Sequence, residues 1–366
     1  MRRVAAALAS LVLSVSAGGN RALSHAPSLS LLRFSPNGRY VLAQDDSSIM
    51  VLTVQPFAFL FRIPAENALP AQFTPDSQQI VFVSSATHAS SQRIDIVRSP
   101  PRVERWRVAN QARVESTQVR LPPCGTQALS PDGSTVVCVD FGGTLHLVDV
   151  LSGQTIFERA KFGRQILIED SALTYRYEYG DPASAIIQFS PDGDFIVAAP
   201  EGWMAVGSPV GFDLRQEKPM KLEGKLKDLE HFVFAFAGPT RLIKAYLDLL
   251  DPAVTAAVIA WPSGKVLMKT KIPGGGLLFQ ATDPGFILVR PFGQAAFSDP
   301  QAKRSAATEL TTGNVIISET PALDVLGNHY VTQLTDGRVA LYERGRPEPV
   351  ATIRLDVSSD PECRTH

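Results

Sequence analysis

One short motif recurs along the chain and constrains its fold more than any other feature. An apolar residue is followed by a four-residue turn of the form Ser-Pro-Asp-Gly, and then by a run of residues with high strand propensity. Four clear copies begin at Phe34, Phe73, Leu129 and Phe189. Proline at the second turn position fixes φ, and Ser, Asp and Gly suit the other positions of a type I turn. Each copy therefore predicts a β-hairpin.

Three weaker copies follow, beginning at Phe236, Ala281 and Val325. Successive copies start 39, 56, 60, 47, 45 and 44 residues apart. Most of these intervals are close to the roughly 40–45 residues of a four-stranded propeller blade. Between the hairpins lie strand–turn–strand units, the clearest of which spans residues 143–156. The sequence therefore predicts an all-β protein, a β-propeller of seven four-stranded blades.

The hairpins and the segment Gly-Thr-Leu-His-Leu-Val-Asp-Val-Leu-Ser-Gly at residues 143–153 resemble the repeats of the WD-repeat and related bacterial propeller families. The resemblance covers roughly residues 28–356. It departs from the family pattern at the Trp-Asp pair, which is Val148-Asp149 here, and in lacking the Gly-His pair. The resemblance implies a divergent bacterial propeller. The ring could close by packing of the first blade on the last, or by residues 21–28 adding to the last blade.

The N-terminus has the pattern of an export signal. Arg2 and Arg3 precede an apolar stretch at residues 4–15, and small residues up to Ala17 provide a cleavage site. We therefore expect a signal peptide at 1–17, an N-terminal segment at 18–27, a single propeller domain at 28–356 and a polar tail at 357–366. The apolar stretch is too short to cross a hydrocarbon core of about 30 Å. The mature chain is expected to lack a membrane span and to be periplasmic or extracellular.

The three cysteines are Cys124, Cys138 and Cys363, and their spacing does not fit a local metal site. Cys124 and Cys138 flank the turn at residues 130–133, which places them on neighbouring antiparallel strands. Export permits a disulfide between them, and two reduced buried thiols are the alternative. Cys363, in the polar tail, is expected to be unpaired.

Two of the intervals contain extra residues, which we place around Arg105 to Leu121 and at residues 161–184. Long loops on a rigid scaffold often carry binding residues. The second insertion contains Tyr175, Arg176, Tyr177 and Tyr179, with the tyrosines on one side of an extended segment. These residues could form a partner-contact surface, or an additional strand whose tyrosine face packs on the propeller.

The sequence contains no catalytic motif for a nucleophile elbow, a phosphate-binding loop or a zinc protease, and it predicts no catalytic, cofactor-binding or metal-binding residues. The net charge of −1 gives no field that would favour nucleic acid. We therefore expect a monomeric, non-catalytic exported propeller that acts as a protein-binding or scaffold module, with another protein or an envelope component as its partner. No cofactor is expected.

Two alternatives remain at this stage. The chain could be a propeller enzyme, such as a lactonase-like hydrolase or a quinoprotein-like oxidoreductase. Such an enzyme would place Asp, Glu, His or Asn side chains together at the mouth of the central channel. The chain could also be an accessory subunit of a larger assembly.

Overall fold

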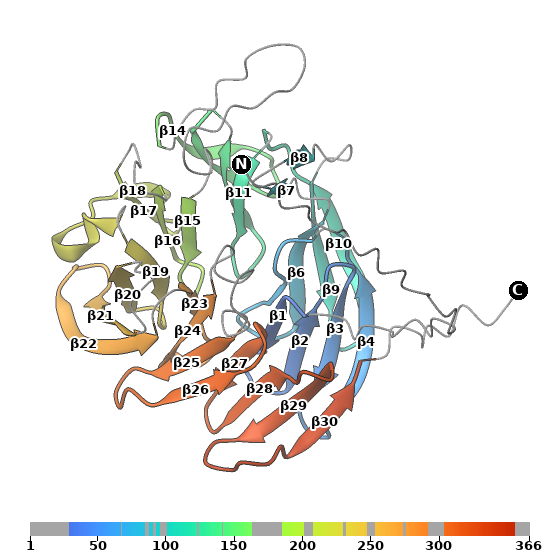
Figure 1. Ribbon diagram of the computed structural model, residues 1–366. Helices are drawn as coiled ribbons and strands as arrows, with labels where there is room; N and C mark the ends of the chain where they lie inside the picture. Colours follow the sequence, from blue (N-terminus) through green and yellow to red (C-terminus); the bar gives the residue numbers. More distant parts are fainter. Residues whose placement is uncertain are drawn as a thin grey trace, which may run out of the picture.

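A computed structural model describes residues 29–66, 68–84, 88–90, 93–95, 101–122, 124–140, 142–162, 185–200, 208–229, 232–246, 253–273, 276–291 and 304–355. These residues form seven four-stranded antiparallel sheets arranged as blades around a central axis (Figure 1). The predicted fold class, an all-β propeller with seven blades, is confirmed. The predicted signal peptide, N-terminal segment and C-terminal tail lie outside the described residues.

Each blade is built from one continuous stretch of chain, with its first strand nearest the axis and its fourth at the rim (Figure 1). Blade 1 consists of β1 (Leu31–Phe34), β2 (Tyr40–Gln44), β3 (Ser48–Thr53) and β4 (Ala58–Pro64). Blade 2 consists of β5 (Gln72–Phe73), β6 (Gln79–Ser84), β9 (Arg102–Arg107) and β10 (Ala112–Gln118). Blade 3 consists of β11 (Cys124–Leu129), β12 (Thr135–Asp140), β13 (Leu145–Asp149) and β14 (Thr155–Arg159).

The remaining four blades have the same order. Blade 4 consists of β15 (Ala185–Phe189), β16 (Phe195–Pro200), β17 (Val210–Asp213) and β18 (Lys218–Met220). Blade 5 consists of β19 (Phe232–Phe236), β20 (Arg241–Tyr246), β21 (Ala253–Ala260) and β22 (Val266–Pro273). Blade 6 consists of β23 (Gly276–Gln280), β24 (Phe286–Pro291), β25 (Ser305–Glu309) and β26 (Val315–Ser318). Blade 7 consists of β27 (Leu323–Leu326), β28 (His329–Gln333), β29 (Arg338–Glu343) and β30 (Ala351–Arg354).

Two further elements lie outside the blades. A short two-stranded sheet, β7 (His88–Ser90) and β8 (Arg93–Asp95), interrupts blade 2, and a 3-10 helix, η1 (Gly224–Leu226), precedes blade 5. Within the described parts of the chain, no helix is long and apolar enough to span a membrane.

All seven predicted hairpins coincide with the first two strands of a blade, and the turn chemistry explains why. In blade 3, Ser130 Oγ donates to Asp132 Oδ1 at 2.6 Å and accepts the Thr135 N–H at 2.9 Å. Asp132 Oδ1 also accepts the Ser134 N–H at 3.0 Å. The same three contacts recur around Ser35, Thr74 and Ser190. In these four hairpins the turn is therefore fixed by hydrogen bonds within the hairpin itself.

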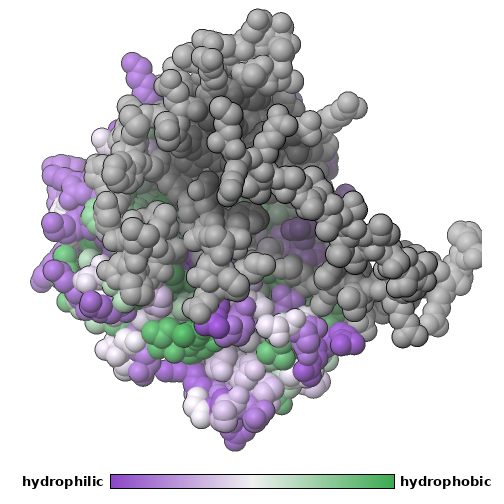
Figure 2. Space-filling view, viewed as in Figure 1, coloured by the Kyte–Doolittle hydropathy of each residue, from purple (hydrophilic) through white to green (hydrophobic). Residues whose placement is uncertain are grey.

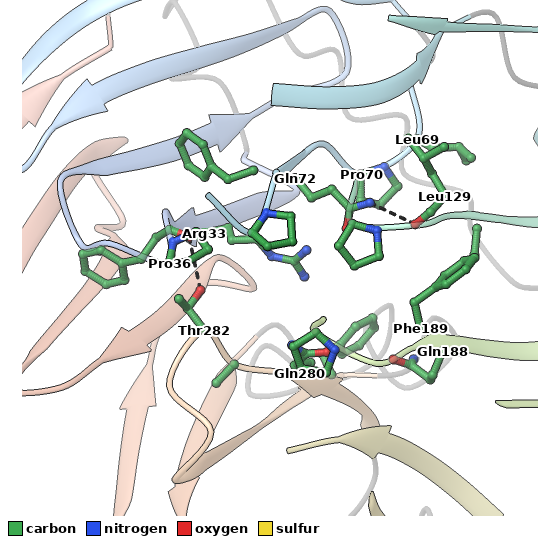
Figure 3. A pocket seen from close by; sticks show the side chains of 18 of the residues that line it. Arg33, Pro36, Leu69, Pro70, Gln72, Leu129, Gln188, Phe189, Gln280 and Thr282 are labelled. Atoms are coloured by element: carbon green, nitrogen blue, oxygen red, sulfur yellow. Dashed lines mark hydrogen bonds between the residues drawn. The ribbon is translucent and has the colours of Figure 1, made fainter. Parts of the chain in front are cut away.

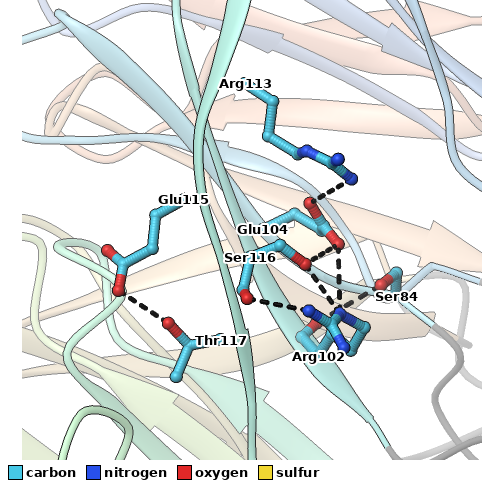
Figure 4. Close-up of polar contacts among 7 residues, drawn as sticks. All are labelled: Ser84, Arg102, Glu104, Arg113, Glu115, Ser116 and Thr117. Carbon is cyan, nitrogen blue, oxygen red and sulfur yellow. Dashed lines mark hydrogen bonds and ion pairs between the residues drawn. The ribbon is translucent and has the colours of Figure 1, made fainter.

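The prediction that Arg105 to Leu121 form an insertion is wrong, because most of these residues form β9 and β10, the outer strands of blade 2. The two strands are rich in charge, and Figure 4 shows how these charges pair across them. Glu104 Oε1 accepts the Ser116 hydroxyl at 2.6 Å, and Arg102 Nη2 donates to the Ser116 carbonyl at 2.9 Å. Because β9 and β10 contain many charged residues, their composition is similar to that of a loop, which explains the error.

The extra residues of blade 2 instead lie between β6 and β9. Those of the next interval lie between β14 and β15, where residues 163–184 are outside the described part. Because successive antiparallel strands alternate in direction, both long connections leave the ring at the end opposite the Ser-Pro-Asp-Gly turns. The connections at the end with these turns are short.

The core consists of seven apolar layers, and each layer lies between two neighbouring blades. The layer between blade 7 and blade 1 closes the ring. It joins Leu32 and Phe34 of blade 1 to Val331 and Leu341 of blade 7. Blade 7 obtains all four of its strands from β27–β30, so the described ring closes by packing of the first blade on the last.

Where the described residues are visible in Figure 2, polar and apolar side chains are mixed. Several exposed large apolar residues lie on fourth strands, among them Phe59, Leu267 and Ile317. Single exposed apolar side chains are common on the surface of folded proteins, so these residues do not by themselves indicate a binding site.

The structure contains a disulfide between Cys124 and Cys138. The two residues lie diagonally across β11 and β12, with Cα atoms 5.8 Å apart, and both are fully buried. The bond ties the innermost strand of blade 3 to the second strand.

Gly133, which ends the turn between the first two strands of blade 3, lies close to the preceding blade, which predicts a strong effect of substitution. Gly133 has φ of +71°, and an added Cβ would lie 3.0 Å from Val81 Cγ1 of blade 2. Gly153 has φ of +68° with nothing within 4 Å. We expect Gly153→Ala to lower the free energy of unfolding by about 1–2 kcal/mol through φ alone. We expect Gly133→Ala to lower it by about 2–4 kcal/mol, because overpacking is added.

Urea unfolding followed by circular dichroism would measure both losses. Equal losses for the two variants would show that the contact between the turn and the neighbouring blade is unimportant.

Candidate ligand-binding site in the central channel

The ring surrounds a cavity of about 480 Å³ on its axis, where the inner strands meet (Figure 3). The described lining residues come from every blade except blade 5. Five of them are prolines from the turns between first and second strands, namely Pro36, Pro75, Pro131, Pro191 and Pro284. The repeated turns therefore also form the rim of the channel.

Several lining residues of the cavity occupy a repeated position, directly before the first residue of the motif. Arg33, Gln72, Ala128 and Gln188 are equivalent, because in each blade the following residue pairs with the residue seven positions later. All four line the cavity. Gln72 Nε2 donates to the carbonyls of Leu129 and Ser130 at 2.9 and 2.8 Å and so links blade 2 to blade 3.

Arg33 is the one charged side chain among the described residues that line the cavity. Figure 3 shows its guanidinium reaching toward the middle of the cavity. Within the described residues it makes no hydrogen bond and no close ion pair. Burial lowers the pKa of Arg33, and the more distant Asp324 carboxylate opposes this shift. An arginine nevertheless stays charged at neutral pH.

Asp324 lies behind the cavity wall, at the junction of blades 6, 7 and 1. Its Oδ2 accepts the Phe34 N–H at 2.8 Å and the Thr282 hydroxyl at 2.5 Å. Its Oδ1 accepts the Thr282 N–H at 3.0 Å. Burial raises the pKa of the Asp324 carboxyl, while these hydrogen bonds and Arg33 act in the opposite direction. Both oxygens accept hydrogen bonds from residues of the channel wall, so this carboxylate stabilises the wall.

A second cation stands near the same carboxylate. Arg290 places its guanidinium carbon 4.8 Å from the ring centre of Phe279, which lines the cavity. Burial and the neighbouring Arg33 lower the pKa of Arg290 to about 10, which leaves it protonated at neutral pH. Two guanidiniums therefore face one carboxylate, and the cluster carries excess positive charge whether or not Asp324 is ionised.

The residues predicted as a partner-contact surface, Tyr175, Arg176, Tyr177 and Tyr179, lie outside the described residues. The alternative of a propeller enzyme predicts Asp, Glu, His or Asn at the channel mouth, and the described lining residues contain none of these. Over the described ranges, no group of three His, Cys, Asp or Glu side chains is placed to hold a metal ion.

His146 has partners that sequence analysis missed. It lies on β13 with its Nε2 at 2.9 Å from Asp140 Oδ2 and its Nδ1 at 3.6 Å from Glu158 Oε2. Asp140 also accepts the Thr144 N–H at 2.8 Å, which fixes the turn between β12 and β13. These contacts stay within blade 3 and away from the channel.

Arg33, Arg290 and Asp324 were not identified from the sequence, although one signal for Arg33 was present. The motif sets a register in which the residue before its first member faces the axis. Reading that column across the copies gives Arg33, Gln72, Ala128 and Gln188. No comparable signal indicates Arg290 or Asp324, since their proximity depends on how the ring closes.

Comparison with known proteins identifies the fold only. No family model and no curated protein matches the sequence. In contrast, 1449 solved chains match the structure, and a likeness so widely shared cannot indicate a function. One of them, Kuenenia stuttgartiensis Hydrazine Synthase, matches with a TM-score of 0.53 over 89% of this chain and 98% of that chain, at 10% identity. The resemblance to WD-repeat propellers therefore holds for the propeller fold and is not extended to a family.

The contacts of Asp324 predict that it is essential for ring closure. Asp324→Ala leaves two N–H groups and one hydroxyl without their acceptor and removes the counter-charge of two arginines. We expect a loss of about 3–5 kcal/mol in the free energy of unfolding, and a smaller loss of about 1–3 kcal/mol for Asp324→Asn.

Asp336→Ala is the matched control in the same blade, because Asp336 is exposed and its hydrogen bonds within the described residues are to Arg338 on the surface. Chemical unfolding of the three variants provides the test. An Asp324→Ala protein as stable as the control would show that the ring does not depend on this carboxylate.

Proposed function

We propose that this chain is a non-catalytic, exported binding module that holds part of its partner, another protein or an envelope component, in the central channel. The observation that carries the proposal is the cavity of about 480 Å³, with a projecting cation, several side-chain amides and an apolar rim. Ligand sites commonly have volumes of about 300–1,000 Å³ and combine apolar walls with a few placed polar groups.

The rigidity of the site also supports this function. The rim is made from turns whose side chains are fixed by local hydrogen bonds, and the inner strands are held by the seven apolar layers. A pre-organised cavity loses little conformational freedom on binding, which favours recognition.

Two features support export. The N-terminal pattern fits a signal peptide ending at Ala17, and the buried Cys124–Cys138 disulfide is typical of proteins that fold in an oxidising compartment.

Export can be tested by expressing the full chain in a Gram-negative host and fractionating the cells. We expect a periplasmic protein that has lost residues 1–17 and that, after denaturation, exposes one thiol out of three cysteines, namely Cys363. Deletion of residues 2–17 should retain the protein in the cytoplasm, where reduction would leave three reactive thiols. Mass spectrometry after thiol labelling distinguishes these results. An uncleaved cytoplasmic chain with three labelled thiols would contradict export.

Binding in the channel can be tested by filling it. Gln188→Trp places a large ring in the cavity, whereas Gln216→Trp makes the same change at an exposed site of the same blade. Both proteins would be immobilised and incubated with envelope extract. A partner that binds to the unmodified protein and to Gln216→Trp, and is depleted at least tenfold with Gln188→Trp, supports the proposal. A partner retained equally by all three proteins would place binding elsewhere.

A further inference from the structure

The contents of the channel also identify the chemical group that it binds. We propose that the cavity binds the C-terminal carboxylate of an extended polypeptide whose last residue is apolar. This inference rests on the proposed function, because it assigns a ligand to the same cavity.

The charge of the cavity favours a single negative charge. Arg33 projects into the space, Arg290 stands behind Phe279, and Asp324 neutralises one of the two cations. About one positive charge is left over, which matches a carboxylate. A phosphate monoester carries about two negative charges at neutral pH and would leave one of them unpaired in a partly apolar site.

The geometry of the cation also favours a carboxylate. The guanidinium presents parallel N–H groups that match the two oxygens of a planar carboxylate. Within the described residues these N–H groups have no acceptor, so a ligand would not have to displace an existing partner. Asp324 is not that acceptor, because its carboxylate interacts with Arg33 only over a longer distance and accepts its hydrogen bonds from Phe34 and Thr282.

A second set of polar groups favours a ligand that also donates a hydrogen bond. Gln188 and Gln280 line the cavity, and the amide oxygen of either can accept a hydrogen bond from a ligand N–H. A ligand that reaches these amides with an N–H gains a hydrogen bond that a carboxylate alone cannot make. The terminal residue of a polypeptide carries a carboxylate and an N–H on the same backbone unit, whereas a simple organic acid carries only the carboxylate.

The remaining walls suit an apolar side chain. Phe279, Ile187 and Leu326 line the cavity together with the five turn prolines, and these three side chains are only partly buried. Burial of an apolar terminal side chain against this wall would add affinity that does not depend on charge.

The test uses calorimetric titration of the mature protein with an N-acetylated tetrapeptide that ends in leucine. The peptide is prepared with a free carboxylate and with a C-terminal amide, and sodium hexanoate is a third ligand. We expect the free acid to bind about ten- to hundredfold more tightly than the amide, as is typical of hydrogen bonds to a charged group. We also expect hexanoate to bind more weakly than the peptide acid.

Arg33→Gln should weaken binding of the acid by about tenfold or more and leave the amide unaffected, while Arg33→Lys should give an intermediate loss. Arg39→Gln is the matched control, since Arg39 is exposed and the change in net charge is the same. Circular dichroism would confirm that each variant is folded. Should Arg33→Gln fail to fold, the acid–amide comparison and Arg33→Lys still test the proposal.

Equal binding of acid and amide would overturn the proposal, as would unchanged binding of the acid to Arg33→Gln. Hexanoate that binds as tightly as the peptide would overturn the assignment to a polypeptide terminus. A partner from envelope extract that is lost with Gln188→Trp but retained by Arg33→Gln would refute the carboxylate site and leave the proposed function intact.

Discussion

The fold depends on one constraint, which is that a four-stranded blade has two apolar faces and can cover neither by itself. Each of the seven layers of the core lies between two blades, so every blade is stabilised by both neighbours. The ring is complete only when residues about three hundred positions apart meet, as where the Leu29 N–H donates to Gln333 Oε1 at 3.0 Å. Closure at the junction of blades 7 and 1 therefore covers the faces of these two blades that would otherwise be exposed.

Because the apolar faces of the blades form the layers, most residues that stabilise the ring differ from those that face the channel. The apolar residues that build the layers, such as Phe34 and Val331, point between blades. The residue directly before the motif instead faces the axis, and it is Arg33, Gln72, Ala128 or Gln188 in the first four copies. That position holds a charged, an amide or a small side chain in these four copies, while the layers on either side remain apolar. The side chains that face the channel can therefore differ between blades within one ring.

What could be predicted from the sequence follows the range of the interactions involved. The hairpins were predictable because Ser130, Asp132 and Thr135 bond within one turn. The outer strands β9 and β10 were mistaken for an insertion, because the pairing of Glu104 with Ser116 and Arg113 becomes visible only when the strands are aligned. The cluster of Arg33, Arg290 and Asp324 could not be predicted at all, since it combines three blades and depends on closure.

Within that cluster, Asp324 and Arg33 have different roles. Asp324 has a structural role, because it accepts three hydrogen bonds that join blades 1, 6 and 7. Arg33 has no comparable role, as it makes no hydrogen bond within the described residues and its charge is opposed by burial and by Arg290. A half-buried cation beside another cation costs stability. Its presence at the axis is best explained by a negatively charged group that enters the channel from outside the chain.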